Sequence, residues 1–164
     1  MINLLIRNKM FSLKGNSTVT DDQENPRFLI EGSVFSLRRK KTVCDLDGNL
    51  LYTIKNKLIR LLMNSCYVYD AQGKKVARIK QKLHLFKREY KLTGYQDNIE
   101  IQGDIIEHCL RIYKNGEQIG EVGRKFLSLV DTFMLTCNNE EDAPLLLALV
   151  IAIDNIQDKN RRDR

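Results

Sequence analysis

The chain has 164 residues, of which 43% are hydrophobic and 29% charged, a composition that fits one soluble domain over residues 1–164 and excludes a low-complexity chain. The net charge of +6 is uneven, because residues 55–91 hold eleven Lys or Arg against two acids, whereas residues 92–142 hold four against ten. A basic region of this kind suits nucleic acid, an anionic membrane surface or an acidic partner.

The chain begins with a short apolar run, residues 1–6, followed at once by Arg7 and Lys9. This run is too short for a signal-peptide core, and no small-residue cleavage site follows it. The four cysteines are widely spaced, without a Cys-x-x-Cys pair, and lie at positions 44, 66, 109 and 137. We therefore expect a cytoplasmic protein whose thiols are reduced and act mainly as small buried apolar groups.

A five-residue pattern recurs along most of the chain, most clearly as IKNKL at 54–58 and IKQKL at 79–83. Its copies begin with Ile or Val at positions 6, 30, 54, 79, 101 and 122, so the steps are 24, 24, 25, 22 and 21 residues. A nearly fixed period of this size indicates a repeat architecture.

Each repeat also carries the sequence of a tight turn. Gly48, Gly73 and Gly116 each lie six residues before a repeat start and follow Asp or Asn within three residues, which is hairpin chemistry. The flanks alternate with period two, as half-buried strands do. One face carries Leu50, Tyr52, Ile54, Leu58, Ala77, Ile79, Leu83, Ile99 and Ile101, and the other carries Thr53, Lys55, Lys57, Arg78, Lys80, Lys82, Glu100 and Gln102. Two strands per unit predict about twelve antiparallel strands.

After residue 140 the period ends. Three acids and Pro144 form a helix-start signature, and residues 145–153 are apolar on every side, which predicts a helix over about 143–156. The apolar run is much shorter than the roughly 20 residues that cross a bilayer. A twelve-stranded barrel is too wide for its own side chains to fill, so we predict a closed, mainly β barrel that encloses this helix.

Three stretches of the chain carry a family resemblance: LLIRNKMFSL at 4–13, the Asp-x-x-Gly hairpins with IKNKL and IKQKL, and APLLLALVIAIDNI at 143–156. The chain resembles the LURP-one-related family, within the tubby C-terminal-like superfamily. The resemblance implies a twelve-stranded barrel around a C-terminal helix. Relatives include the phosphoinositide-binding tubby domain and phospholipid scramblases, but the small bacterial members, which this chain resembles in length, imply no activity.

The stretch VCDLDGNLL at 43–51 offers an enzymatic alternative. It resembles the loop of haloacid-dehalogenase-like phosphatases, where Asp45 would attack phosphorus and Asp47 would act as acid and base beside Mg²⁺. Asn49 stands where that family has Thr, and Asp45 aligns in the repeat with Asp70 of a plain turn. We therefore favour a hairpin turn and predict no enzyme.

Metal and cofactor sites are not indicated either. His84 and His108 are the two histidines, and neither has a Cys or His at metal-ligand spacing. We predict no catalytic residue, cofactor or metal.

The remaining candidate site is basic and consists of Arg38, Arg39, Lys40, Lys41, Lys55, Lys57, Lys80 and Lys82. Lysines of neighbouring hairpins can form one surface, and as point charges they suit phosphate groups; a merely solubilising outer face is the competing interpretation. Nucleic acid is less favoured because the nearest aromatics, Tyr90 and Tyr95, offer no evident stacking platform. We expect a cytoplasmic, membrane-peripheral, non-enzymatic binding or scaffold protein that recognises anionic, phosphoinositide-like lipid headgroups or a protein partner.

Overall fold

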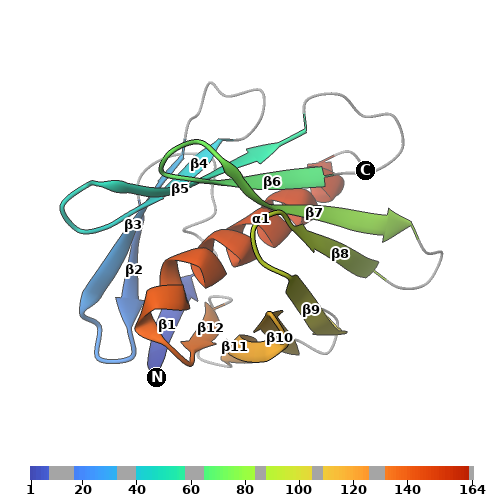
Figure 1. Cartoon of the computed structure of the whole chain (residues 1–164). Coiled ribbons are helices and arrows are strands. Elements are labelled where there is room, and N and C mark those ends of the chain that lie inside the picture. The colour runs from blue at the N-terminus through green and yellow to red at the C-terminus, as the bar shows by residue number, and fades with distance from the viewer. Residues whose placement is uncertain are drawn as a thin grey trace.

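A computed structural model gives the fold (Figure 1) and describes residues 1–7, 17–32, 40–57, 65–83, 88–104, 109–125 and 132–162. Side chains are described in these ranges except at 7, 81–90, 103–104, 124–125, 132 and 157–162. The elements in chain order are β1 (Ile2–Arg7), β2 (Ser17–Asp21), β3 (Pro26–Gly32), β4 (Lys41–Cys44), β5 (Leu50–Asn56), β6 (Ser65–Asp70), β7 (Lys75–Leu83), β8 (Arg88–Gly94), β9 (Ile99–Asp104), β10 (Cys109–Lys114), β11 (Glu117–Lys125), β12 (Thr132–Cys137), a 3-10 turn η2 (Glu140–Asp142) and α1 (Ala143–Arg162).

The twelve strands form one antiparallel sheet in the order β8-β7-β6-β5-β4-β3-β2-β1-β12-β11-β10-β9. The predicted twelve-stranded antiparallel barrel is thereby confirmed, and it is nearly closed, since the edge strands β8 and β9 do not pair within the described residues. Their short connection is held from both sides: the Tyr95 amide donates to the Val76 carbonyl at 3.0 Å, and the Asn98 amide donates to Asn115 Oδ1 at 2.9 Å. These bonds tie β8 to β7 and β9 to β10.

The sequence repeat corresponds to the odd-numbered strands. Its six starting residues fall in β1, β3, β5, β7, β9 and β11. Ile6, Ile30, Ile54 and Ile79 are buried, as is Val122, and Ile101 packs against the core while partly exposed. The period is therefore that of one strand pair, with the apolar residue pointing inward each time.

The C-terminal helix fills the barrel (Figure 1). It begins at Ala143, as predicted, and its side chains are buried from Leu145 to Ile153 on all sides. It continues to Arg162, beyond the predicted end near 156, because the residues that follow include good helix formers and contain no Gly or Pro. No helix in the described part of the chain is long and apolar enough to cross a membrane.

The tight turns lie together at one end of the barrel, because consecutive strands alternate in direction. The end where α1 starts, here named the turn end, carries the segments 21–25, 45–49, 70–74, 95–98, 114–117 and 138–142. These hold eleven Asp or Glu against two Lys. The turn end is therefore strongly acidic, although the whole chain is basic.

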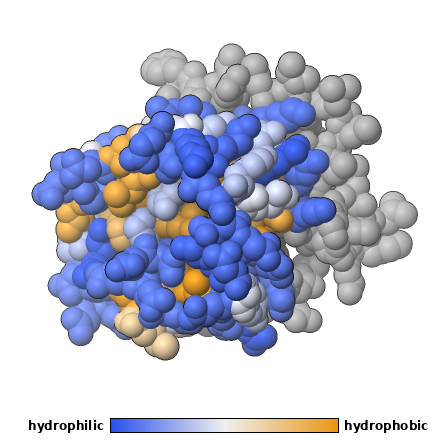
Figure 2. Space-filling view, in the orientation of Figure 1, coloured by the Kyte–Doolittle hydropathy of each residue, from blue (hydrophilic) through white to orange (hydrophobic). Residues whose placement is uncertain are grey.

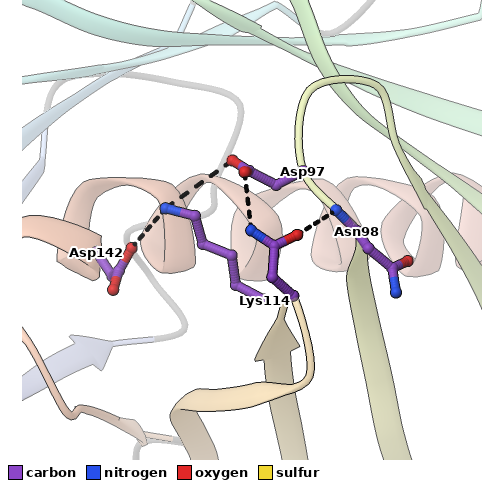
Figure 3. A network of polar contacts seen from close by, with 5 residues as sticks. Asp97, Asn98, Lys114 and Asp142 are labelled. Carbon is purple, nitrogen blue, oxygen red and sulfur yellow. Dashed lines mark hydrogen bonds and ion pairs between the residues drawn. The ribbon is translucent and has the colours of Figure 1, made fainter.

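A polar network at the turn end fixes the start of the helix (Figure 3). Lys114 Nζ lies 3.2 Å from Asp142 Oδ1 and 3.9 Å from Asp97 Oδ2. Asn115 Nδ2 donates to the other oxygen of Asp97 at 3.1 Å. Burial lowers the pKa of Lys114, but the bond to Asp142 and the nearby carboxylates outweigh it, so the net pKa is raised. The network ties the β8–β9 turn, the β10–β11 turn and η2 together where the sheet is open.

One residue that the sequence predicts to point into the core, Leu50, points outward. Leu50 was expected on the core face, but it is 39% exposed. The cause is a β-bulge: Val43 pairs with Tyr52, whereas Cys44 pairs with Leu50, so Leu51 is an extra residue that reverses the alternation.

Candidate anion-binding face

The strand register brings basic side chains from separate hairpins onto one outer surface. Lys55 of β5 lies opposite Tyr67 of β6, which lies opposite Arg78 of β7. In the next row, Ser65 lies opposite Lys80, which lies opposite Lys91 of β8. The Lys57 amide donates to the Ser65 carbonyl at 2.9 Å, which places Lys57 at the start of this second row.

We name this surface the basic face and define it by its outward cations Lys55, Lys57, Lys75, Arg78, Lys80 and Lys91. No acidic residue is among the described outward side chains of β5, β6, β7 and β8. The field of these cations is therefore not cancelled locally by described groups.

Two tyrosines of β6 hold several of these cations in place. Lys55 Nζ lies 5.2 Å from the ring centroid of Tyr69. Lys75 Nζ lies 4.9 Å from the Tyr67 centroid and the Arg78 guanidinium carbon lies 5.4 Å from it. Contacts within about 6 Å are attractive cation–π interactions, so the charges are pre-positioned on the sheet.

The candidate residues predicted from sequence do not all lie on this surface. Lys55, Lys57 and Lys80 lie together on the basic face, and the backbone of Lys82 lies in β7 beside them. Lys40 is exposed just before β4. The structure does not describe Arg38 and Arg39.

Lys41 lies inside the barrel and is not part of the basic face. Its side chain is 3% exposed, and its Nζ lies 3.8 Å from Asp154 Oδ2 of α1. Asn56 Nδ2 donates to the Asn155 carbonyl at 3.4 Å in the same interior. Burial raises the pKa of the neighbouring Cys66 thiol to about 12, so it is protonated and unreactive at neutral pH.

Lys75, Arg78 and Lys91 are recognisable in the sequence as basic residues, and Arg78 is expected on the same outward face as Lys80, but the candidate site leaves all three out. Sequence reasoning misses Tyr67 and Tyr69, which lie beside them. The two tyrosines sit two residues apart, which is the spacing of one strand face. Tyr90 and Tyr95 are therefore not the nearest aromatics, because Tyr67 and Tyr69 lie within cation–π distance of the basic side chains. They come from β6, which has no basic residue of its own.

The DLDGN stretch is a hairpin turn, as favoured above. Asp45 Oδ1 accepts from the Asn49 amide at 2.8 Å, and Oδ2 accepts from Asn49 Nδ2 at 2.8 Å. Gly48 has a φ of 85°. The side-chain bond from Asn49 lowers the pKa of the Asp45 carboxyl, and both of its oxygens are engaged in stabilising the turn.

The same turn occurs three times. The Lys74 amide donates to Asp70 Oδ1 at 2.8 Å, and the Asn25 amide donates to Asp21 Oδ1 at 2.9 Å. Their recurrence marks these aspartates as turn formers. Among the described residues, no three His, Cys, Asp or Glu side chains are grouped as a metal site requires; His84 and His108 lie outside the described residues.

The described surface seen in the orientation of Figure 1 is mainly hydrophilic, with apolar side chains in separate smaller areas (Figure 2). A nearly closed barrel of twelve antiparallel strands around one buried helix defines a class of helix-filled β-barrel proteins. Residues 2–154 match the family model described as LURP-one-related, and the chain belongs to that family.

Two individual proteins are also similar to it. The uncharacterized protein YxjI of Bacillus subtilis (strain 168) is 32% identical over 157 residues, which cover 95% of this chain and 94% of YxjI. The X-ray structure of a protein from Arabidopsis thaliana aligns with a TM-score of 0.64 and 19% identity, over 95% of this chain and 91% of that one. The second likeness concerns the fold alone.

Proposed function

We propose that this protein is a non-enzymatic binding protein that attaches to anionic, phosphate-rich membrane surfaces through the basic face. The observation that carries the proposal is the register, which aligns Lys55 with Arg78 across β6, and Lys57 with Lys80 and Lys91 in the next row across β6, β7 and β8. Because these cations share one side of the sheet, they can meet a flat anionic surface together.

The acidic turn end supports a defined orientation. Eleven Asp or Glu against two Lys lie in its turn segments, so an anionic surface repels this end of the barrel. The basic face is attracted at the same time, and the two effects orient the molecule before contact. Attachment is peripheral and reversible, since the basic face contributes charge and not an inserted apolar segment.

The expected strength follows from the number of charges. Each Lys or Arg near an anionic surface contributes about 1 kcal/mol, and the effect decays over a Debye length of about 8–10 Å at moderate salt. Neutralising two lysines therefore weakens binding by roughly 30-fold.

Vesicle sedimentation of the full chain tests the proposal. Wild-type protein should bind phosphatidylglycerol or phosphoinositide vesicles at low salt, release them as salt rises, and ignore phosphatidylcholine vesicles. Lys57→Gln/Lys80→Gln should lose roughly 30-fold in affinity. Equal recovery with neutral and anionic vesicles, or none with either, would refute attachment through charge.

A matched control distinguishes the contribution of the basic face to vesicle binding from that of the net charge. Lys57 on the face and Lys74 at the turn end are both exposed, so Lys57→Glu and Lys74→Glu change the net charge equally. Only Lys57→Glu should weaken vesicle binding. If both weaken it to the same extent, binding follows net charge; if neither does and the fold is intact, the face serves a protein partner or solubility.

A further inference from the structure

Two lysines face each other directly at the centre of the β7–β8 ladder. Lys80 lies opposite Lys91, and one step along the same strands Arg78 lies opposite Thr93. Directly opposed residues have Cβ atoms about 4.5–5.5 Å apart, and like charges in this arrangement repel. Three cations and one hydroxyl thus occupy four adjoining positions of the outer face. We name these four residues, Arg78, Lys80, Lys91 and Thr93, the β7–β8 quartet.

No described carboxylate compensates this repulsion. Ion pairs among the described residues form at other cations, such as Arg27, Arg111 and Lys114. The outward neighbours on β6 are Ser65 opposite Lys80 and Tyr67 opposite Arg78, which carry no charge at neutral pH.

Arg78 adds a second, independent observation. Its Nε is buried and has no hydrogen-bond acceptor within the described structure, although buried donors are almost always satisfied. Its guanidinium carbon lies 5.4 Å from the Tyr67 ring centroid, so the ring restricts where the group can move. An anion is the kind of group that would satisfy this donor and offset the repulsion of the two opposed lysines.

We propose that the β7–β8 quartet binds a phosphate group, with Lys80 and Lys91 on either side of it, Arg78 donating through its guanidinium, and the exposed Thr93 hydroxyl completing the set. The phosphate suits the site because several oxygens can accept at once from cations on two strands. The inference rests on the proposed function only where it takes the phosphate from a lipid headgroup. Free phosphate offers the quartet the same chemistry.

Thermal unfolding of the full chain, in low-salt buffer free of phosphate, tests the quartet without a membrane. Lys91→Gln should raise the melting temperature, because it removes the opposed charge. Inorganic phosphate should raise the melting temperature of wild type beyond the effect of sodium chloride at equal ionic strength, and Lys91→Gln should weaken the phosphate affinity at least tenfold.

Lys57→Gln is the matched control. Lys57 is an exposed lysine of the same face, but Ser65 and not a cation lies beside it. This variant should show no rise in melting temperature and should keep the phosphate response. The inference is overturned if Lys91→Gln does not stabilise the apo protein, or if phosphate acts equally on wild type and Lys91→Gln.

Vesicles distinguish the source of the phosphate and separate the two proposals. A phosphate response without binding to phosphatidylglycerol vesicles refutes the membrane function and leaves the quartet standing. The opposite outcome is that the protein binds vesicles but does not respond to inorganic phosphate, and that Lys91→Gln weakens vesicle binding no more than Lys57→Gln does. This outcome refutes the quartet and leaves the membrane function standing.

Discussion

Replacing Leu147 by Ala tests whether α1 is the core of the barrel. Leu147 is 0% exposed, and strands pack around the helix that carries it. Leu→Ala changes at buried sites cost about 2–5 kcal/mol, with the larger values where the surroundings cannot collapse into the cavity. Because the nearly closed barrel of strands limits collapse, we expect about 3–5 kcal/mol, a large part of the roughly 5–15 kcal/mol that stabilises a domain.

Urea unfolding followed by far-UV circular dichroism measures this loss, since the chain has no tryptophan. Leu46→Ala is the matched control: Leu46 is 52% exposed, and the change should stay within about 0.5 kcal/mol. Leu147→Asp places a charge in the same site and should give insoluble or unfolded protein. A Leu147→Ala variant within about 1 kcal/mol of wild type, or a soluble Leu147→Asp protein with a native melting curve, would contradict a buried helix.

Three further changes test the turns and the network at the turn end. Glu24 has a φ of 67°, so Glu24→Gly should stabilise the protein by about 0.5–1 kcal/mol, because relief of the left-handed strain exceeds the added chain entropy; an unchanged or lower urea midpoint would refute this. Asp45→Asn should keep the fold and show no difference from wild type in Mg²⁺ titration, whereas a stoichiometric Mg²⁺ site lost in the variant would restore the phosphatase hypothesis. The pKa of Asp45 is lowered in the folded state, so its ionised carboxyl adds stability above about pH 4, and this stability should fade as the pH falls through that lowered pKa. Lys114→Met should lower the free energy of unfolding, measured in urea, by about 1–2 kcal/mol, because it leaves the Asp142 carboxylate without its cation.

The local sequence predicts most of this fold because each strand pair repeats the same turn residues and the same alternation of apolar and polar side chains. Asp and Gly at fixed spacing gave the turns at Gly48 and Gly73, whose φ values are 85° and 79°. The equivalent turn at Asp21 was not recognised, because Glu24 occupies the position that Gly takes elsewhere. A non-glycine residue can adopt this conformation at a modest energetic cost, so the sequence signal is lost while the turn remains.

The basic face was only partly predictable, because it depends on register. Lys91 and Arg78 were visible as basic residues, but their positions relative to Lys80 follow from pairing between strands and not from spacing along one strand. A single extra residue reverses the alternation, as the bulge at Leu51 shows. Side-chain direction near a bulge therefore cannot be read from period two alone.

Lys41 shows why consecutive basic residues need not all lie on the protein surface. Residues 38–41 are four consecutive cations, and in an extended strand neighbouring side chains must point to opposite faces. Lys41 pairs with Ile54, whose side chain is buried, so it shares the inner face. Its charge is tolerated there because Asp154, at the other end of the chain, supplies a carboxylate from α1. Breaking such a buried pair destabilises the fold, so a change at Lys41 that abolished binding would report on the core, and only variants of the basic face can report on an anionic ligand.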